Sequence, residues 1–275
     1  MRKPCVAIVT GGSRGIGKGV ALALGEAGAT VYVTGRTRRG EAPPIGGTID
    51  DTADEVTRRG GRGVAVACDH ADDDQVAAVF ERVDAEAGPL DLLVNNVFAI
   101  PDGPLYNVVF WEQPLATWDT LIDIGLRSHY VASVFAAKRM VAARAGLIAN
   151  ISSFGAASYQ INVAYGVGKA ALDRLTRDSA KDLAPFGVAV VSLWPGIVRT
   201  ERVLAGEFPY DTSISESPEL TGRAIVALAT DPDRMVRSGK ALVVAELAAD
   251  YGFTDIDGST PPSLRKQRFT TTVDR

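Results

Sequence analysis

The sequence is poor in the residues that mark several large classes of protein. Its 275 residues contain two cysteines, Cys5 and Cys68, and two histidines, His70 and His129. The cysteines are far apart, each in or beside an apolar run, so we interpret both as buried free thiols; a disulfide or a metal pair is the less favoured alternative. Neither histidine has a partner at metal-ligand spacing. We therefore expect His129 in a helix, His70 in a loop, and no bound metal.

Long apolar runs and a strong charge of either sign are also missing. No stretch approaches the roughly 20 apolar residues of a membrane span, and the first ten residues lack the apolar core and small-residue cleavage site of a signal peptide. A net charge of −4 argues against a nucleic-acid partner. Hydrophobic residues at 46% and charged residues at 23% are ordinary values for a globular protein. We expect a cytoplasmic protein with no membrane span.

What the sequence does contain is a regular alternation of two kinds of segment. Short β-branched runs predict strands at residues 6–10, 30–34, 63–68, 91–95, 147–151, 188–194 and 240–245. Longer amphipathic segments predict helices at residues 17–27, 51–59, 73–87, 118–143, 164–183 and 217–230. This alternation is typical of a parallel sheet with helices on both faces. We predict an α/β fold: a single doubly wound Rossmann domain over residues 1–275 with a seven-stranded parallel sheet.

Loops that follow strand ends are the natural places for a substrate pocket. Residues 100–117 and 200–218 break the periodicity and follow strand carboxyl ends, where open α/β sheets bind ligands. Their apolar side chains predict a pocket for an apolar substrate. These are Phe98, Leu105, Tyr106, Phe110, Trp111 and the region 208–210. The alternative is that the aromatic side chains pack against one another as a lid. The tail after about residue 250 is polar and says little.

A glycine-rich turn follows the first expected strand and opens the first helix. Residues 10–17 read Thr-Gly-Gly-Ser-Arg-Gly-Ile-Gly. Glycines at such a turn let the backbone approach a pyrophosphate, whose charge then meets the positive end of the helix. We predict that a dinucleotide binds here, and a purely structural turn is the alternative. The predicted contacts are Gly11, Ser13, Arg14, Gly15, Ile16 and Gly17.

The end of the second strand indicates which dinucleotide binds. An acidic residue at this place would take the ribose 2′-hydroxyl of NAD, but the strand is followed by Arg36. Arg14 adds a second positive charge from the glycine turn. Both guanidinium groups would attract a 2′-phosphate, so we predict NADP(H) as the cofactor; the alternative is that they are solvated loop charges.

A tyrosine and a lysine four residues apart suggest acid–base chemistry. Tyr165 and Lys169 fall on one face of an expected helix. An unperturbed tyrosine has a pKa of about 10, so a working acid needs its phenolate stabilised by a nearby positive charge. Ser152 and Ser153 follow the fifth strand at the same sheet edge, where a hydroxyl could donate to a developing oxyanion. Taken singly, each residue has an ordinary structural explanation.

Five motifs stand in order along nearly the whole chain. They are the glycine turn of residues 10–17, Asn95-Asn96, Ile151-Ser152-Ser153, the segment from Tyr165 to Lys169, and residues 195–200. In this order and spacing the chain resembles the classical short-chain dehydrogenase/reductases. The gap of three residues between Gly11 and Gly15 matches the classical branch.

The resemblance implies a role for each matching position. Tyr165 would be the general acid, Lys169 would bind the nicotinamide ribose and lower the pKa of the tyrosine, and Ser153 would orient the carbonyl. Asp69 would lie by the adenine and Asn95 beneath the cofactor. The segment that would hold the nicotinamide amide contains Pro195, Gly196, Val198 and Thr200. The family resemblance also implies a homodimer or homotetramer, commonly formed through the fourth and fifth helices.

Three departures from the family pattern bear on these roles. Gly125 stands where the family usually has an asparagine that supports a water of the proton relay. The signature Asn-Asn-Ala-Gly reads Asn-Asn-Val-Phe at residues 95–98, with the bulky Phe98 in place of glycine. Ser153 lies 12 residues before Tyr165, one fewer than is common, which leaves Ser152 as a possible substitute.

Together these patterns predict an NADPH-dependent oxidoreductase. It would transfer a hydride between nicotinamide and an aldehyde or ketone, with an apolar substrate favoured. The alternative is an NADPH-binding sensor or scaffold with little catalysis, which the changes at Gly125 and Phe98 suggest. The intact pair of Tyr165 and Lys169 favours the enzyme, because a protein that only binds has no need of an activated phenol.

Overall fold

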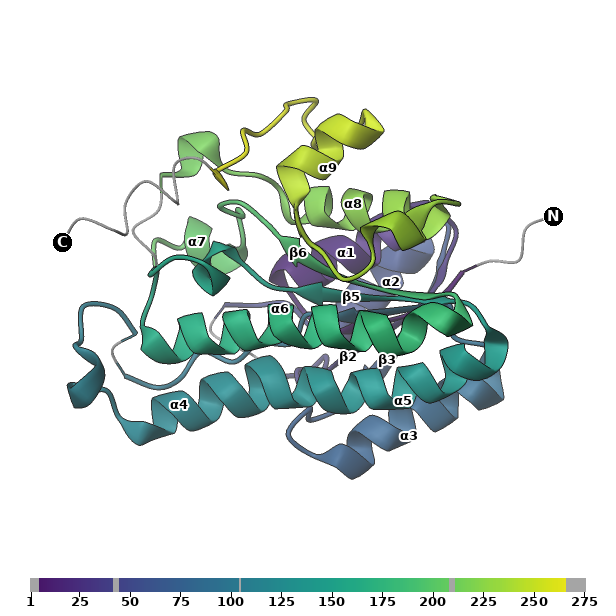
Figure 1. Ribbon diagram of the computed structural model, residues 1–275, viewed down its shortest axis with the longest axis horizontal. Coiled ribbons are helices and arrows are strands. Elements are labelled where there is room, and N and C mark those ends of the chain that lie inside the picture. Colours follow the sequence, from purple (N-terminus) through teal and green to yellow (C-terminus); the bar gives the residue numbers. More distant parts are fainter. Residues whose placement is uncertain (1–4, 42–44, 104, 208–210, 266–275) are drawn as a thin grey trace.

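The computed structural model describes residues 5–41, 45–103, 105–207 and 211–265, and its seven strands form one parallel sheet (Figure 1). The strands are β1 (Val6–Thr10), β2 (Thr30–Gly35), β3 (Arg62–Ala67), β4 (Leu92–Asn95), β5 (Gly146–Ile151), β6 (Val188–Trp194) and β7 (Ala241–Val243). Their spatial order is β3-β2-β1-β4-β5-β6-β7. The predicted doubly wound fold is therefore confirmed, and the strands agree with the expected ranges to within one or two residues at most ends.

Helices cover both faces of this sheet. They are α1 (Gly15–Glu26), α2 (Ile49–Arg58), α3 (Asp73–Glu86), α4 (Leu115–Ile122), α5 (Ser128–Ala143), α6 (Val163–Leu183), α7 (Glu201–Leu204), α8 (Pro218–Thr230) and α9 (Val244–Tyr251). One apolar core lies between the sheet and α1, α2, α8 and α9, and a second lies between the sheet and α3, α5 and α6. Burial on both faces explains why β1, β4, β5 and β6 are fully buried runs.

The winding direction of the chain reverses between β1 and β4. From β1 the chain moves outward through β2 and β3, then returns to β4 on the other side of β1 and continues to β7. The loops after β1 and β4 therefore diverge and leave a crevice beyond the carboxyl ends of the strands. The glycine turn and residues 96–98 both open into this crevice.

The expected helix at residues 118–143 is a composite. The helix begins earlier, at Leu115, and between α4 and α5 it passes through a π-helical segment at Asp123–Arg127 that contains the buried Gly125. Such π segments insert a residue into the helix and occur often at functional sites. The sequence pattern predicts a single helix here and does not reveal this segment.

The carboxyl-terminal part differs most from expectation. The apolar run at 240–245 predicts one strand, but only Ala241–Val243 pair with β6 and α9 follows at once. The sequence says little about the tail after about residue 250, whereas the structure shows that part of it is buried. Asp255 and Leu264 are 1% and 2% exposed, because the tail packs back over the loops at the carboxyl end of the sheet.

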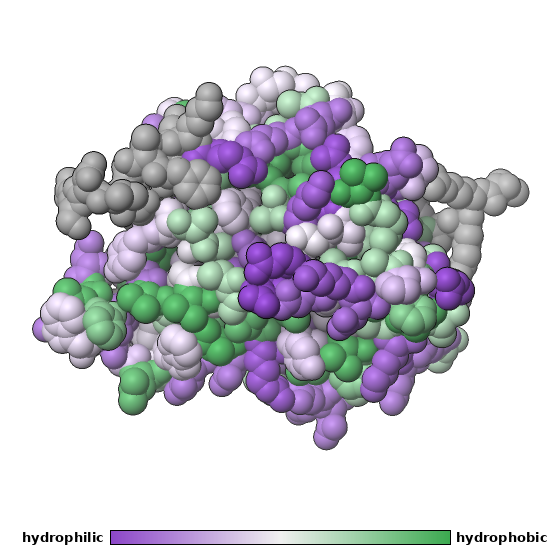
Figure 2. Space-filling view, in the orientation of Figure 1, coloured by the Kyte–Doolittle hydropathy of each residue, from purple (hydrophilic) through white to green (hydrophobic). Residues whose placement is uncertain are grey.

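Apolar side chains gather at the surface on one side of the molecule. Figure 2 shows them over the beginning of α4 and the first half of α6. The exposed residues there include Leu115, Trp118, Val163 and Val167. Within the described ranges, no helix is both long enough and apolar enough to cross a bilayer.

Candidate functional site

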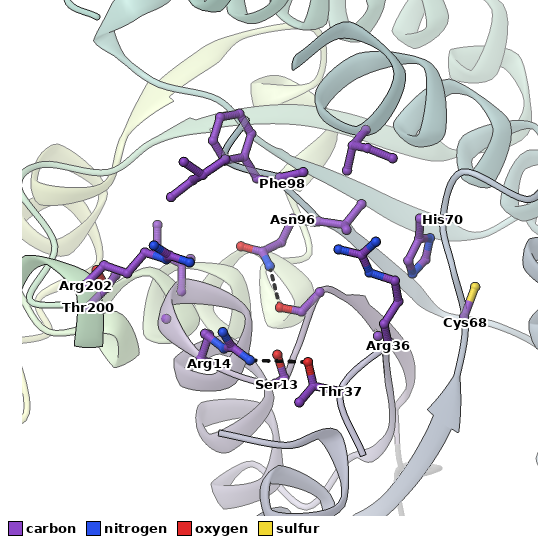
Figure 3. A pocket seen from close by; sticks show the side chains of 18 of the residues that line it. Ser13, Arg14, Arg36, Thr37, Cys68, His70, Asn96, Phe98, Thr200 and Arg202 are labelled. Carbon is purple, nitrogen blue, oxygen red and sulfur yellow. Dashed lines mark hydrogen bonds between the residues drawn. The ribbon is translucent and has the colours of Figure 1, made fainter. Parts of the chain in front are cut away.

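A cleft of about 390 Å³ lies at the carboxyl ends of β1 to β4 (Figure 3). It brings together most of the residues that the sequence predicts for the cofactor: Gly11, Ser13, Arg14, Gly15, Ile16, Arg36, Asp69 and Thr200. The other predicted cofactor residues do not line it: Gly17, Asn95, Tyr165, Lys169, Pro195, Gly196 and Val198. Asn96, Val97 and Phe98, which follow β4, also line it and lie next to the glycine turn.

The glycines of the turn are needed for packing as well as for access. Gly11 has a φ of +67°, and a Cβ there would lie 2.7 Å from the Cα of Val97. A Cβ on Gly17 would lie 2.4 Å from the carbonyl oxygen of Gly11. Asn96 fastens the turn to the β4 loop, since its Nδ2 donates to the carbonyl oxygens of Thr10 and Gly11 at 2.8 and 3.0 Å. Glycine is therefore required in this turn partly because the turn packs closely against the loop after β4.

Guanidinium groups stand around the opening of the cleft. The Nη2 of Arg14 donates to Oγ1 of Thr37 and to the carbonyl oxygen of Gly47, both at 3.3 Å, which ties the glycine turn to the loop after β2. Burial lowers the pKa of Arg14, but a guanidinium group keeps its proton in proteins, so Arg14 carries a positive charge. Arg36 is 71% exposed, and its Nη1 lies 3.8 Å from Oδ2 of Asp69. Arg36 is thus free to turn toward a ligand in the cleft.

The predicted catalytic residues meet at the end of β5. The phenol of Tyr165 donates to Oγ of Ser153 at 2.8 Å, and Ser153 also caps the short 3-10 helix Phe154–Ala156 by accepting from the N–H of Gly155. Ser152 is buried and donates to the backbone carbonyl of Lys169 at 3.3 Å. The structure therefore brings Ser153 rather than Ser152 to Tyr165, despite the shortened spacing.

Lys169 is enclosed behind Tyr165. Its Nζ donates to the carbonyl oxygen of Ile151 at 2.9 Å, and only 8% of the residue is exposed. Burial lowers the pKa of this ammonium to about 8, and the nearby carboxylate of Asp173 acts in the opposite direction. Asp173 itself accepts from Ser192 and Trp194, which hold it one helical turn beyond Lys169.

Asn162 is a site residue that the sequence analysis missed. It caps α6, because its Oδ1 accepts from the N–H of Tyr165 at 2.9 Å while its Nδ2 donates to the carbonyl oxygen of Leu105. It therefore fixes both the start of the helix and one wall loop. An asparagine just before a helical run is an N-cap signal that could have been recognised.

Two residues predicted to contact the cofactor, Asn95 and Val198, instead bond to neighbouring parts of the protein. Asn95 is fully buried, and its Nδ2 donates to Oδ1 of Asn150 at 2.8 Å and to Oγ of Ser133 at 2.9 Å. It therefore joins β4 to β5 and α5, whereas Asn96 faces the cleft. In the 195–200 segment, Val198 forms an isolated bridge with Glu216, so this segment is supported from behind by the residues preceding α8.

The predicted aromatic pocket is only partly assembled. Phe98 faces the reacting end, with its ring 6.0 Å from that of Tyr165 in an edge-on arrangement. Phe110 and Trp111 instead pack against each other at 5.4 Å and are 62% and 71% exposed. They lie on the surface, as the lid alternative would place them. Residues 208–210 are outside the described part of the chain.

The comparisons with known proteins agree with this geometry. The family model for short chain dehydrogenases matches residues 5–205. The chain is 47% identical to "Dehydrogenase/reductase SDR family member 1" of Mus musculus and 45% identical to the Homo sapiens protein, in each case over 92% of this chain and 83% of the relative.

Solved structures share the fold over most of the chain. A putative dehydrogenase from Xanthomonas campestris has a TM-score of 0.82 at 26% identity, covering 94% of both chains. A metagenomic short-chain oxidoreductase in complex with NADP has a TM-score of 0.71 at 31% identity, covering 87% of this chain and 96% of that one. A 7α-hydroxysteroid dehydrogenase complexed with NADH and 7-oxo glycochenodeoxycholic acid has a TM-score of 0.75 at 26% identity, covering 88% and 93%. The chain belongs to the short-chain dehydrogenase family and is an oxidoreductase.

Proposed function

We propose that this oxidoreductase uses NADP(H) to interconvert an aldehyde or ketone and the corresponding alcohol, with Ser153, Tyr165 and Lys169 as its catalytic residues. The observation that carries the proposal is the 2.8 Å hydrogen bond from Tyr165 to Ser153, with the ammonium of Lys169 buried beside it. An acid, a second hydroxyl and a fixed positive charge thus converge beside Phe98, which lines the cleft.

Each of the three residues has a separate task in the proton transfer. The two hydroxyls of Ser153 and Tyr165 can both donate to a carbonyl oxygen placed between them, which stabilises the negative charge that develops there. Tyr165 then gives its proton to that oxygen and becomes a phenolate. The ammonium of Lys169, 5.9 Å from the centre of the Tyr165 ring, stabilises the phenolate by Coulomb attraction in a partly buried site. The nicotinamide, when bound, supplies or accepts the hydride.

Two features of the cleft support a dinucleotide with a 2′-phosphate as the cofactor. Its floor is the amino-terminal end of α1, which favours a pyrophosphate. Arg14 and Arg36 both line the cleft and would attract a 2′-phosphate, and the hydroxyl of Thr37 accepts a hydrogen bond from Arg14. The NADP complex of the metagenomic relative supports this choice, whereas the NADH complex of the steroid dehydrogenase shows that the family accommodates both cofactors. The pyrophosphate would be bound by the glycine turn, through Gly11, Ser13, Gly15, Ile16 and Gly17. Asp69 would lie by the adenine, and Asn95 would lie beneath the cofactor.

The proposal also includes the nicotinamide-binding segment, the substrate class, the oligomeric state and the location expected from the sequence. Pro195, Gly196, Val198 and Thr200 would hold the nicotinamide amide. Phe98 at the reacting end favours an apolar substrate. The exposed apolar side chains on α4 and α6 support a homodimer or homotetramer formed through this side of the molecule. The unpaired thiols Cys5 and Cys68 agree with a cytoplasmic location.

The test is to titrate the purified protein with NADPH and NADH and then follow oxidation of the reduced nicotinamide against aldehydes, quinones and hydrophobic ketones. We expect NADPH to bind more tightly and at least one apolar carbonyl to be reduced. Tyr165→Phe should retain NADPH binding and lose turnover by a factor on the order of 10² to 10⁴, the usual contribution of a general acid.

Two results would argue against the proposal. Full turnover by Tyr165→Phe on a verified substrate would remove the tyrosine from the acid role. Tight NADPH binding without any consumption across the panel would favour the sensor or scaffold function, which the sequence changes at Gly125 and Phe98 first suggested.

A further inference from the structure

The ring of Phe98 contacts both reacting residues at once. Phe98 follows β4 and lines the cleft, and it is 38% exposed. Its ring meets that of Tyr165 edge-on, at 6.0 Å between centroids and 88° between planes. The Nζ of Lys169 lies 5.2 Å from the centroid of the Phe98 ring, closer than the 5.9 Å to the ring of Tyr165. One side chain therefore touches the acid and the cation that activates it.

Gly125 leaves the space that this ring needs. A Cβ at position 125 would lie 3.4 Å from Cδ2 and 3.5 Å from Cε2 of Phe98, so a methyl group would just reach van der Waals contact. Any longer side chain would enter the volume of the ring. Residues 98 and 125 thus share one space, although they lie on different elements.

The helix that contains Gly125 continues into α5, and α5 anchors the backbone next to Phe98. His129 lies four residues after Gly125 and is 1% exposed, and its Nε2 is 2.9 Å from the carbonyl oxygen of Val97. A carbonyl only accepts hydrogen bonds, so Nε2 carries the proton and donates. Burial lowers the pKa of His129 to about 3, which keeps the ring neutral. Gly125 and His129, one helical turn apart, therefore provide the gap for the Phe98 ring and the anchor for its backbone.

We propose that Phe98 is a positioning residue of the reacting site that works as a pair with Gly125, holding the phenol of Tyr165 and the ammonium of Lys169 in their relative orientation. The face of an aromatic ring attracts an ammonium, which opposes the cost of burying that charge. The ring of Phe98 lies where a side chain at position 125, the usual place of the family's asparagine, would extend. The inference rests on the proposed function, because it concerns the same acid.

Replacing the ring by an aliphatic side chain tests its effect on the ammonium. Phe98→Leu keeps much of the bulk and removes the aromatic face, so Lys169 should lose its proton more readily and stabilise the Tyr165 phenolate less. We expect the ionisation midpoint of Tyr165 to rise by about half to one pH unit. The midpoint is read from the phenolate absorption of each protein minus that of the matching Tyr165→Phe variant, and this measurement needs no substrate.

The matched control is Phe186→Leu. Phe186 also lies under a cation, with the guanidinium carbon of Arg144 5.9 Å from its ring, but it lies at the opposite end of the sheet, before β6. The control should leave the Tyr165 midpoint unchanged. A Phe98→Leu protein with the wild-type midpoint would overturn the proposal.

The pairing with Gly125 has its own test, which stays informative if Phe98→Leu folds poorly. Gly125→Ala is the smallest change in this series, because its methyl would only reach van der Waals contact with the ring. Gly125→Asn should displace the ring and lower turnover about tenfold or more, and Phe98→Ala in the same chain should restore part of that loss because it vacates the space.

The outcome is read as a double-mutant cycle, with thermal unfolding of every variant recorded. Recovery in the double variant relative to Gly125→Asn supports the pair, whereas losses that simply multiply would overturn it. If the wild-type protein binds NADPH but reduces no carbonyl, the proposed function fails, while the tyrosine titration of the same variants still decides whether Phe98 and Gly125 act together.

Discussion

At the scale of single residues, the buried ammonium of Lys169 sets the pH range of the site. Burial lowers its pKa from 10.5 to about 8, so the charge is present below this pH and lost above it. Because the neutral amine cannot stabilise the Tyr165 phenolate, kcat/KM for carbonyl reduction should fall as the pH rises through about 8. The measurement is a pH profile of kcat/KM, which reports groups of the free enzyme.

Removing the ammonium should lower kcat/KM and also abolish its fall as the pH rises through about 8. We expect Lys169→Met to lower kcat/KM by about a hundredfold or more. Lys181→Met, an exposed lysine in the last turn of the same helix, is the control and should behave as wild type. An unchanged alkaline limb in Lys169→Met would show that another group titrates there.

Arg36 decides the choice of cofactor in the proposed function. Its guanidinium is 71% exposed beside the cleft and held only loosely by Asp69 at 3.8 Å. A hydrogen bond to a charged phosphate contributes roughly 1.5 to 3 kcal/mol, so Arg36→Ala should weaken NADPH binding about 10- to 100-fold and leave NADH binding almost unchanged.

The comparison is made by fluorescence titration of each variant with both cofactors. Arg58→Ala is a matched control, because Arg58 is equally exposed at 71% but pairs with Glu55 on α2, outside the cleft. Equal losses for NADPH and NADH in Arg36→Ala would mean that Arg36 does not read the 2′-phosphate.

At the scale of the elements, short-range sequence patterns predicted the strands and the long helices. The seven strands and the six long helices follow from runs and periods within 5 to 20 residues, and their ends shifted mostly by one or two residues. The short helix α7 and the helix α9 were missed. The apolar start of α9 reads equally well as the end of a strand, and only pairing with β6 decides where β7 stops.

Site residues could be predicted where they belong to a short motif whose residue types indicate a chemical role. The glycine turn, Tyr165, Lys169 and Ser153 are recognisable in the sequence, and the structure places the last three together. The cap at Asn162 and the seating of Phe98 against Gly125 depend on which loops meet across the sheet edge. No local pattern contains that contact, since residues 98 and 125 lie on separate elements.

Helix α7 places a carboxylate at the anion-binding end of α1. Oε2 of Glu201 accepts from the N–H of Gly15 at 2.9 Å, at the first residue of that helix. A phosphate bound there would compete for the same amide and be repelled by the carboxylate. Glu201→Gln should therefore bind NADPH more tightly, by roughly two- to tenfold for an electrostatic effect of this kind.

Cofactor titration at several salt concentrations checks this prediction. The gain should shrink at high salt, because exposed charges are screened. Glu219→Gln, which changes a carboxylate in the first turn of α8 outside the cleft, should show no gain. Weaker NADPH binding by Glu201→Gln would mean that the carboxylate supports the bound state.

At the scale of the whole molecule, a buried carboxyl links folding stability to pH. Glu216 is 1% exposed, and its Oε1 has no hydrogen-bond partner among the described residues. Burial raises its pKa from 4.5 to about 8, and the charge of Asp255 acts in the same direction, against a hydrogen bond from the backbone of Gly196 and the charge of Arg199. The folded protein therefore keeps a proton on Glu216 that the unfolded chain releases.

The sign of the resulting pH dependence follows from that proton. Between about pH 4.5 and 8 the folded state binds more protons at this position, so its contribution to the free energy of unfolding declines as the pH rises, by at most about 4 to 5 kcal/mol. His70 and His129 act in the opposite direction at acid pH. Burial lowers their pKa values to about 4 and 3, which makes the folded state lose stability as the pH falls below about 6.5.

Glu216→Gln separates these contributions, because an amide has nearly the shape of the protonated acid and does not titrate. Denaturant unfolding across the pH range should show equal stability for variant and wild type near pH 5, and an advantage for the variant that grows toward pH 8. The acid-side loss, which comes from the histidines, should be the same in both proteins. A constant difference at every pH would show that Glu216 is already ionised in the folded protein and that the packed tail around Asp255 tolerates two adjacent negative charges.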